Sequence, residues 1–175
     1  SSLSDQLFTK GSLTDNQIAA WHRGKEKLRR TQEENAKADR EVDLAPIRAM
    51  FETAVGNGYK RPSYRAEGLV ISRAPDSGRN PGALYVKNES DVYGGKVMGT
   101  TFSPSQDGRR SGFVSGEGVS MTALEALVLI SEDPLQAALR YGQRTGRCAC
   151  CGRLLTNHTS IDLGIGPICR EKWGL

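Results

Sequence analysis

The sequence predicts an α+β fold. One stretch before residue 60 and another after residue 120 carry apolar residues at helical spacing, whereas the middle of the chain holds short β-branched and aromatic runs separated by Gly, Pro, Asn and Asp. All four cysteines lie within residues 146–175. We therefore expect three parts: a helical region with a charged helix or tether over 1–58, a small antiparallel β-sheet domain with following helices over 59–142, and a cysteine-bearing module over 143–175.

The composition indicates small modules rather than one thick core. Of the 175 residues, 37% are hydrophobic and 6% aromatic, and 20 residues are glycine. No apolar run approaches the roughly 20 residues that cross a bilayer, and the first residues lack the charged and apolar regions of a leader peptide. We therefore expect a soluble, cytoplasmic protein without a membrane partner.

Charge is spread unevenly along the chain, whose formal net charge is +4. Residues 59–112 carry nine positive and five negative side chains, and residues 138–175 carry six and two. A modest excess of this kind permits contact with phosphates but does not require it.

The N-terminal region is expected to be helical. Thr14 and Gln17 occupy capping-box positions and predict a helix start, and a short helix is expected before them over 3–11. The stretch 23–43 is almost entirely polar, which is typical of a long exposed helix or a flexible tether. A further helix is expected over 45–58.

The middle of the chain is typical of a small antiparallel sheet. A turn-rich loop is expected over 74–82, and a mobile loop rich in glycine over 106–118. The expected strands lie within residues 68–74, 83–90, 92–100 and 101–105.

Two helices are expected after the sheet. Thr122 and Glu125 are spaced as a capping box at the start of 121–130. Asp133 as N-cap and Pro134 at the first helical position predict the start of the second helix.

The cysteine segment predicts a zinc site. Cys148 and Cys151 are followed by Gly-Arg, the pattern of a zinc knuckle, in which glycine permits the tight turn that brings two thiolates to one ion. After an expected hairpin, Cys169 falls in the first turn of a helix, where the helix dipole favours a thiolate. Because so short a tail with few apolar residues needs a staple, we expect a C-terminal zinc-stapled module of treble-clef-like shape.

The sequence leaves the fourth zinc ligand open. His158 lies between the two ligand clusters and is the favoured candidate, Cys150 is next, and Asp162 or water follows. Two other interpretations of the segment are a thioredoxin-like redox pair and a Cys169 that is simply a small buried residue. A closed four-ligand site would be structural, and neither the metalloprotease motif nor the zinc-deaminase motif occurs in the chain.

The segment 146–175 also resembles a family of small cysteine-bearing domains of unknown function found in many bacteriophage and actinobacterial proteins, with the pattern C-x-x-CGR-x-LT-x-x-x-S-x-x-x-GIGP-x-C. Upstream, "GRNPGALYVKNESDVYGGKVMGTTF" and "GSLTDNQ" are similar to stretches of phage proteins of this type. The resemblance implies a phage-encoded protein of the host cytoplasm, from genes near replication or recombination functions. His158 and Cys150 occupy positions that the pattern leaves variable. The matching residues are Cys148, Cys151, Gly152, Arg153, Leu155, Thr156, Ser160, Gly164, Ile165, Gly166, Pro167 and Cys169.

Basic and aromatic residues alternate on the expected strands and their loops. This mixture suits single-stranded nucleic acid, because cations meet the phosphates and bases stack on the rings. The alternative is a small sheet whose charged residues form an ordinary solvated face, and the knuckle arginines can likewise meet phosphates or stay in solvent. The predicted nucleic-acid-binding residues are Arg73, Arg79, Tyr85, Lys87, Tyr93, Lys96, Arg147 and Arg153, with Phe102 and Arg144 nearby in the same segments.

These features predict a phage accessory protein that binds nucleic acid, with single-stranded DNA favoured, during replication or recombination and without catalysis. The alternative is a protein-binding host-takeover or anti-defence factor that inhibits or redirects a host enzyme, with the expected helices at 14–22 and 45–55 as docking surfaces. An enzyme has less support, because the sequence holds no GK[ST] phosphate loop, no nucleophile elbow and only two histidines.

Overall fold

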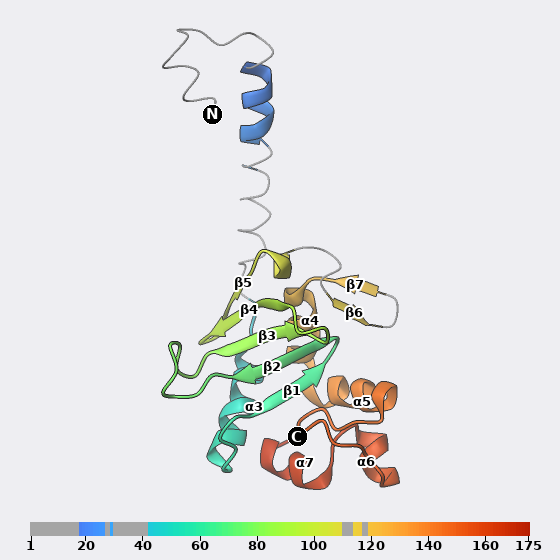
Figure 1. The fold of residues 1–175 in the computed structure, drawn as a ribbon. Coiled ribbons are helices and arrows are strands. Elements are labelled where there is room, and N and C mark those ends of the chain that lie inside the picture. The colour runs from blue at the N-terminus through green and yellow to red at the C-terminus, as the bar shows by residue number, and fades with distance from the viewer. Residues whose placement is uncertain (1–17, 27–28, 30–41, 110–113, 117–118) are drawn as a thin grey trace. The chain divides into compact units, whose positions relative to one another are not determined.

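The computed structural model describes residues 18–26, 29, 42–109, 114–116 and 119–175. Residues 18–26 are helical (Figure 1). The helix start predicted at Thr14 and Gln17, the short helix over 3–11 and most of the polar stretch over 23–43 lie outside the described residues.

A five-stranded antiparallel sheet forms the centre of Glu41–Leu175, the second of the two compact units into which the chain divides (Figure 1). The strands lie side by side in the order β1-β2-β3-β4-β5, so each strand pairs with its neighbours in the sequence. Together with the helices described in the next paragraph, this sheet confirms the predicted α+β class. The strands are β1 (Ser63–Ala66), β2 (Leu69–Arg73), β3 (Leu84–Asn88), β4 (Tyr93–Met98) and β5 (Thr101–Pro104).

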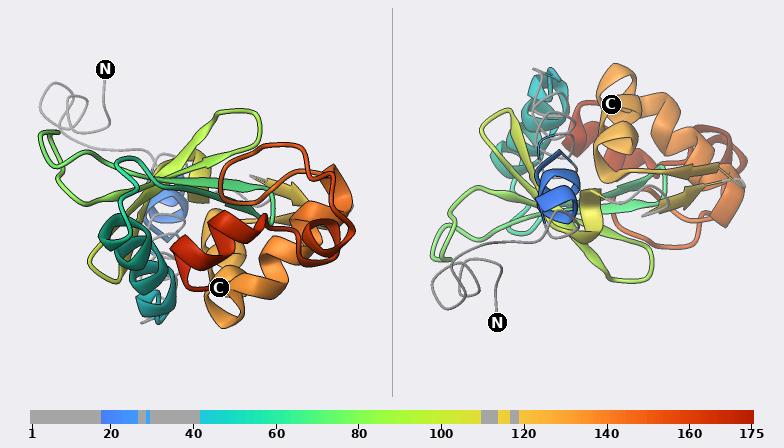
Figure 2. Two further views of the ribbon diagram at one scale, coloured as in Figure 1. Left: turned by 90° about the horizontal axis from the view of Figure 1, so that it is seen from below. Right: turned by 90° about the horizontal axis from the view of Figure 1, so that it is seen from above.

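Helices pack against one face of this sheet (Figure 2). Alternate strand residues point to that face, and Leu69, Ile71, Leu84 and Val86 are each at most 1% exposed. Among the described residues, no helix is long and apolar enough to cross a membrane. The helices are α3 (Ala45–Gly56), α4 (Ala123–Glu132), α5 (Pro134–Thr145), α6 (His158–Leu163) and α7 (Pro167–Trp173).

One core joins α3, the sheet and the C-terminal module. The ring of Trp173 in α7 lies 4.9 Å from that of Phe51 in α3 and 5.8 Å from that of Tyr64 in β1, measured between centroids. All three side chains are at most 1% exposed. The helix that the sequence assigned to the N-terminal region therefore shares its core with the sheet and with the cysteine module.

A bulge in β4 changes which side chains share a face. The register between β3 and β4 shifts between Val86 and Lys87, so that Tyr93 pairs with Lys87. Strict alternation would place Tyr93 and Lys96 on opposite faces because they are three residues apart, but the extra bulge residue brings both to the face away from the core. Gly95 has a φ of 144° in this bulged stretch, a conformation that other residues rarely adopt. An added Cβ there would lie 2.5 Å from the Ser103 carbonyl oxygen.

Both predicted helix starts after the sheet are confirmed. The Thr122 hydroxyl accepts a hydrogen bond from the Glu125 backbone N–H, and the Glu125 carboxylate accepts one from the Thr122 backbone N–H, which completes a capping box. The Asp133 side chain caps α5 by accepting from the Gln136 N–H, and Pro134 follows it. Local chemistry determines both helix starts.

Two segments differ from the sequence prediction. Within 106–118, expected to be a mobile loop, the structure has a short 3-10 helix (Asp107–Arg109) and the strand β6 (Val114–Gly116), which pairs with β7 (Val119–Met121). β1 was not predicted at all. It is joined to β2 by a two-residue turn, Glu67 and Gly68, and both residues have positive φ, as a tight hairpin requires.

Candidate metal centre and outer sheet face

Three cysteine sulfurs meet at one point of the C-terminal module. The Sγ atoms of Cys148, Cys151 and Cys169 all lie within 4.8 Å of one another, although Cys169 is far from the other two in sequence. Cys148 and Cys169 are buried and Cys151 is exposed. No disulfide joins them, because all four cysteines are free thiols. The arrangement confirms that these three residues can hold a metal ion together.

Backbone geometry places the first two sulfurs. The Cys148 N–H donates to the Arg153 carbonyl, and the Gly152 N–H donates to the Cys148 carbonyl, both at 2.8 Å, which closes the knuckle. Gly152 has a φ of 72°, a conformation that glycine adopts without strain. A single β-bridge between Arg147 and Leu154 ties the two ends of the turn together.

A helix start places the third sulfur. α7 begins at Pro167 after the N-cap Gly166, so Cys169 lies in its first turn, as predicted. The Gly166 N–H also points to the Cys148 sulfur at 3.4 Å. Tyr59 reaches the site from the far end of α3, with its hydroxyl 3.3 Å from the Cys169 sulfur. The site is therefore built from the knuckle, the start of α7 and the segment after α3.

Hydrogen bonds within the cluster favour a thiolate at Cys148. Donation from the thiols of Cys150 and Cys169, aided by the Gly166 and Cys151 N–H groups, lowers the pKa of Cys148 well below its usual range. The interaction with Cys148 in turn raises the pKa of Cys169, and burial raises that of Cys150. Of Cys148, Cys150 and Cys169, Cys148 is therefore the first to ionise, and the thiolate is the form that binds a metal ion.

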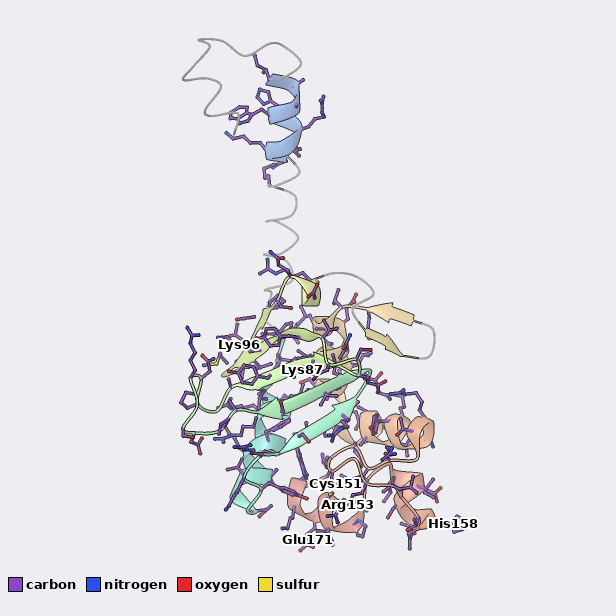
Figure 3. The ribbon with its side chains drawn as sticks, viewed as in Figure 1. Lys87, Lys96, Cys151, Arg153, His158 and Glu171 are labelled. Atoms are coloured by element: carbon purple, nitrogen blue, oxygen red, sulfur yellow. The ribbon has the colours of Figure 1, made fainter. Side chains whose placement is uncertain are left out.

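The structure does not bring the predicted fourth ligand to these sulfurs. His158 is the first residue of α6, is exposed, and lies apart from Cys151 (Figure 3). The hairpin expected in this stretch is instead the helix α6, capped by the Asn157 side chain, and Asp162 is exposed on the same helix. Cys150 is buried beside Cys148 but does not belong to the group of three. Among the described residues, the group of potential ligands within 4.8 Å contains three members.

A pocket of about 760 Å³ lies against the three sulfurs. Its wall includes Cys148, Cys151 and Cys169 together with Tyr59 and residues of α6 and α7. Sequence reasoning did not predict this pocket, because its lining comes from segments that only the fold brings together.

The second candidate surface is the face of the sheet that points away from the helices. Tyr85 of β3 pairs with Lys96 of β4, and Lys87 of β3 pairs with Tyr93 of β4. The two tyrosine rings lie 6.3 Å apart at an angle of 60°. Figure 3 shows Lys87 and Lys96 over neighbouring strands of this face. The structure therefore brings four of the predicted residues together as two aromatic and two cationic side chains.

The outer face is ordered by hydrogen bonds from the loop between β2 and β3. The Asn80 amide donates to the Tyr85 hydroxyl at 2.9 Å, and its oxygen accepts from the Lys96 ammonium at 3.5 Å. Lys87 forms an exposed ion pair with Asp91 at 2.8 Å. We refer to Tyr85, Lys87, Tyr93 and Lys96 as the outer patch.

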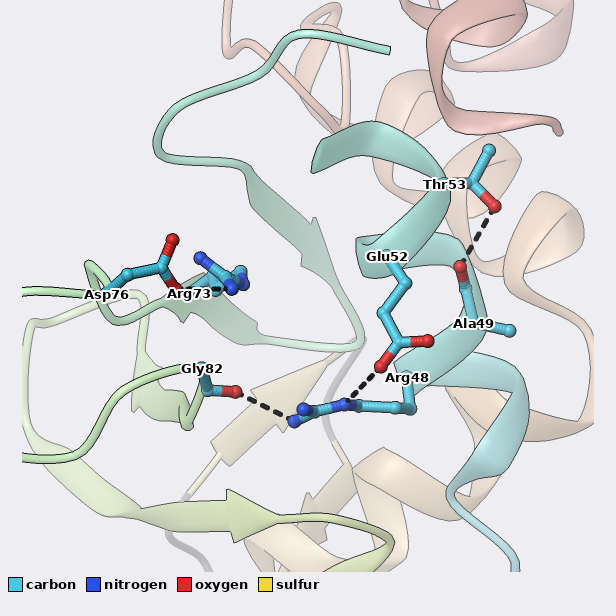
Figure 4. Close-up of polar contacts among 7 residues, drawn as sticks. All are labelled: Arg48, Ala49, Glu52, Thr53, Arg73, Asp76 and Gly82. Atoms are coloured by element: carbon cyan, nitrogen blue, oxygen red, sulfur yellow. Dashed lines mark hydrogen bonds and ion pairs between the residues drawn. The ribbon is translucent and has the colours of Figure 1, made fainter. Parts of the chain in front are cut away.

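Three other residues named with this set lie elsewhere. Arg73 follows Leu69 and Ile71 in the alternation of β2 and pairs with Asp76 at 2.7 Å on the side of α3, near Arg48 (Figure 4). Arg48 binds the Gly82 carbonyl there at 2.7 Å. Arg79 is exposed in the loop after β2, and Phe102 is buried in the core.

The knuckle adjoins the sheet through Arg65, a residue that the sequence analysis missed. The Arg65 N–H donates to the Ala149 carbonyl at 2.8 Å, so the knuckle extends the edge of β1. The Arg65 guanidinium lies 3.4 Å from the Cys150 carbonyl oxygen and packs beside Gly152. Arg147 donates to the Gly152 carbonyl at 3.1 Å, and Arg153 is exposed. In the sequence, polar Ser63 and Arg65 alternate with the apolar residues Tyr64 and Ala66, which are buried. This alternation is the signal that could have indicated a strand with Arg65 on its outer face.

Comparison with known proteins covers only this module. Residues 138–174 match the profile of a family of unknown function (DUF6011). The match spans the second half of α5, the knuckle, α6 and α7. No curated protein and no solved structure matches the chain significantly. The resemblance drawn from the cysteine pattern is therefore confirmed as a likeness to a family of unknown function.

Proposed function

We propose that this protein binds a single strand of nucleic acid on the outer patch, and that a zinc ion holds its C-terminal module in shape. The observation that carries the proposal is the pairing of Tyr85 with Lys96 and of Lys87 with Tyr93 on the face opposite the helices. A strand is held where rings stack against bases and cations meet the phosphates between them.

The lysines of the outer patch are available to phosphates. Lys87 is paired with Asp91, but the Asp91 side chain is 83% exposed, and an exposed ion pair contributes only about 0–1 kcal/mol. Lys96 has Asn80 as its neighbour rather than an acid. A phosphate can therefore approach either lysine without breaking a strong interaction.

The knuckle extends this surface with arginines. Arg65 lies in the same cross-strand row as Val70, Lys87 and Tyr93 and contacts the knuckle backbone. The Arg147 guanidinium donates to the Gly152 carbonyl within the knuckle. A metal ion at the thiols would fix this turn and so would hold Arg65 in place in the row that it shares with Lys87 and Tyr93.

Zinc is the ion that the donor set favours. Thiolates are soft ligands that select zinc, copper(I) or iron–sulfur clusters, and a knuckle followed by a helix start is the usual setting of a structural zinc ion. The three sulfurs and their spacing support zinc, whose presence metal analysis of the purified protein tests directly.

The binding experiment is a titration of a labelled single-stranded oligonucleotide, followed by fluorescence anisotropy at several salt concentrations. Tyr93→Ala is expected to weaken binding about tenfold, because stacking of one base contributes about 1–3 kcal/mol. Lys96→Ala is expected to reduce the salt slope by about 0.7, the loss of one phosphate contact.

Matched variants distinguish binding at the outer patch from a general effect of positive charge. Arg73→Ala removes the same charge as Lys96→Ala but on the helix side of the sheet, so it is expected to change the affinity less than about twofold. Tyr85→Phe keeps the ring and loses only the Asn80 hydrogen bond, and is expected to bind nearly as the wild type. No binding at low salt, or equal losses in Arg73→Ala and Lys96→Ala, would contradict the proposal.

The resemblance to phage proteins extends this proposal to an accessory role in replication or recombination. The alternative, a factor that redirects a host enzyme, makes a different prediction. It requires that a host protein stay on the tagged chain after nuclease treatment, whereas the nucleic-acid proposal requires that retained proteins be released with the nucleic acid.

A further inference from the structure

We propose that the pocket beside the three cysteines binds a small organic thiolate that also carries an acidic group, and that the sulfur of this ligand completes the coordination of the metal ion. The proposal rests on the metal centre proposed above and assigns it a second role as a binding site.

The first observation is the number of protein donors. Zinc bound by thiolates is almost always four-coordinate, and a site with three protein ligands keeps one position for an outside molecule. Three sulfurs come together here, and within the described residues His158, Asp162 and Cys150 are not members of their group. Within the described part of the chain, one coordination position of a bound ion is therefore left without a protein ligand.

The second observation is that the sulfurs form part of the pocket wall. Cys148, Cys151 and Cys169 all line it, so an ion bound between them borders the pocket. Ser160, which is 7% exposed, lies in the same wall. A molecule in this pocket could therefore reach an ion held by the three sulfurs.

The third observation is the charge of the lining. It contains Arg153 and Arg170 and no aspartate or glutamate. Arg153 makes no ion pair among the described residues, whereas Arg170 donates to the Leu175 carbonyl at 2.9 Å. A divalent ion with three thiolates has a net charge of about −1, so the two arginines leave the pocket positive and suited to an anion.

The ligand class follows from these three observations. A metal ion surrounded by thiolates is soft and prefers sulfur to phosphate or carboxylate oxygen as its remaining donor. Leu154 and Ile168, which are 64% and 67% exposed, offer apolar surface for a short carbon chain. Arg153 can bind a carboxylate at the other end of the molecule. On binding, the thiol releases its proton to solvent and its sulfur displaces water, and no bond within the protein changes.

The experiment replaces zinc with cobalt(II) in the full chain and titrates mercaptoacetate, with absorption as the readout. The sulfur-to-cobalt charge-transfer band is expected to grow by about one third as the thiolates increase from three to four. Propionate, which has the carboxylate but no thiol, should leave the band unchanged. Ethanethiol, which has no carboxylate, should bind about tenfold more weakly, because it lacks the charge-assisted contact. As a control, gel filtration followed by metal analysis tests whether the cobalt stays on the protein during the titration.

Variants locate the ligand. Arg153→Ala is expected to abolish the preference for mercaptoacetate over ethanethiol while the cobalt spectrum without ligand stays the same. His158→Ala and Cys150→Ala are expected to leave both spectra unchanged. Cobalt that binds but does not respond to mercaptoacetate overturns this proposal and leaves the structural metal site intact. A chain that binds neither cobalt nor zinc overturns both the ligand proposal and the proposed metal site.

Discussion

The sheet and the C-terminal module are stabilised in different ways. In the sheet, alternate residues such as Tyr64, Leu69 and Ile71 are completely buried against helices. In the module, α6 buries only Ser160, the backbone of Gly164 approaches α5 closely, and three sulfurs lie where a metal ion could join them. A region with few apolar side chains needs specific points of attachment, and each of these is more sensitive to a single change than a residue of a large core.

The two regions nevertheless share part of their core, since Trp173 and Ile165 are both 1% exposed. If the proposed zinc ion is bound, its removal should therefore disorder the module first and weaken the sheet only through this contact. The following changes test how separate the two regions are.

The largest effect is expected from removing one of the three metal-binding sulfurs. Cys151→Ala should weaken zinc binding by about a hundredfold or more and expose residues 146–175 to amide hydrogen exchange, while the amides of β2 and β3 stay protected. Cys150→Ala is the matched control, because the adjacent thiol lies outside the group of three. It should keep one zinc per chain. Equal zinc loss in the two variants would contradict the assignment of ligands.

The second-largest effect is expected from substituting a glycine in the module. Gly164 has a φ of 65°, and an added Cβ would lie 1.9 Å from the Ala138 carbonyl oxygen. Gly164→Ala should lower the free energy of unfolding by about 3–5 kcal/mol, because α6 could no longer approach α5. Gly166→Ala is the control, with nothing within 4 Å of an added Cβ, and should change stability by less than about 1 kcal/mol. Urea unfolding followed by Trp173 fluorescence, in a Trp21→Phe background, measures both.

The corresponding position in the sheet is Gly95. An added Cβ there would lie 2.8 Å from the Phe102 ring and would destroy the bulge. Gly95→Ala should lower the free energy of unfolding by about 2–3 kcal/mol and weaken oligonucleotide binding, while zinc content stays at one per chain. Gly56→Ala, at an open position of α3, serves as the control. Loss of zinc in Gly95→Ala would show that the two regions depend on each other more than the structure indicates.

The smallest effect is expected at the start of α4. Thr122→Ala removes the side-chain half of the capping box and should lower the free energy of unfolding by about 1 kcal/mol. Thr122→Ser keeps the hydroxyl and should restore most of the loss. Zinc content and nucleic-acid binding should be unchanged in both, since the cap touches neither site.

Sequence reasoning succeeded where a signal lies within a few residues. The box at Thr122 and Glu125, the cap at Asp133 and the turn at Cys148 and Cys151 are of this kind, because each depends on hydrogen bonds or spacing across one turn. It failed at β1, whose four residues are too short for a clear pattern, and at α6, where a helix of six residues replaced the expected hairpin.

The outer patch shows why alternation alone was insufficient. Arg73 and Lys96 looked equivalent in sequence, yet they lie on opposite faces of the sheet. The position of Tyr93 beside Tyr85 depends on the bulge in β4, which is defined by the pairing of β3 with β4 rather than by β4 itself.

The sequence by itself determined the α+β class, the helix caps and the pair of knuckle cysteines, because these depend on chemistry between near neighbours in the chain. The sequence also predicted Cys169 as the third ligand, and the structure confirms that its sulfur meets that pair. Only the tertiary structure decided that His158 does not, that Arg65 contacts the knuckle and that a pocket lies beside the sulfurs. These features join residues far apart in sequence, and their distances are set by strand register and by how α5, α6 and α7 pack.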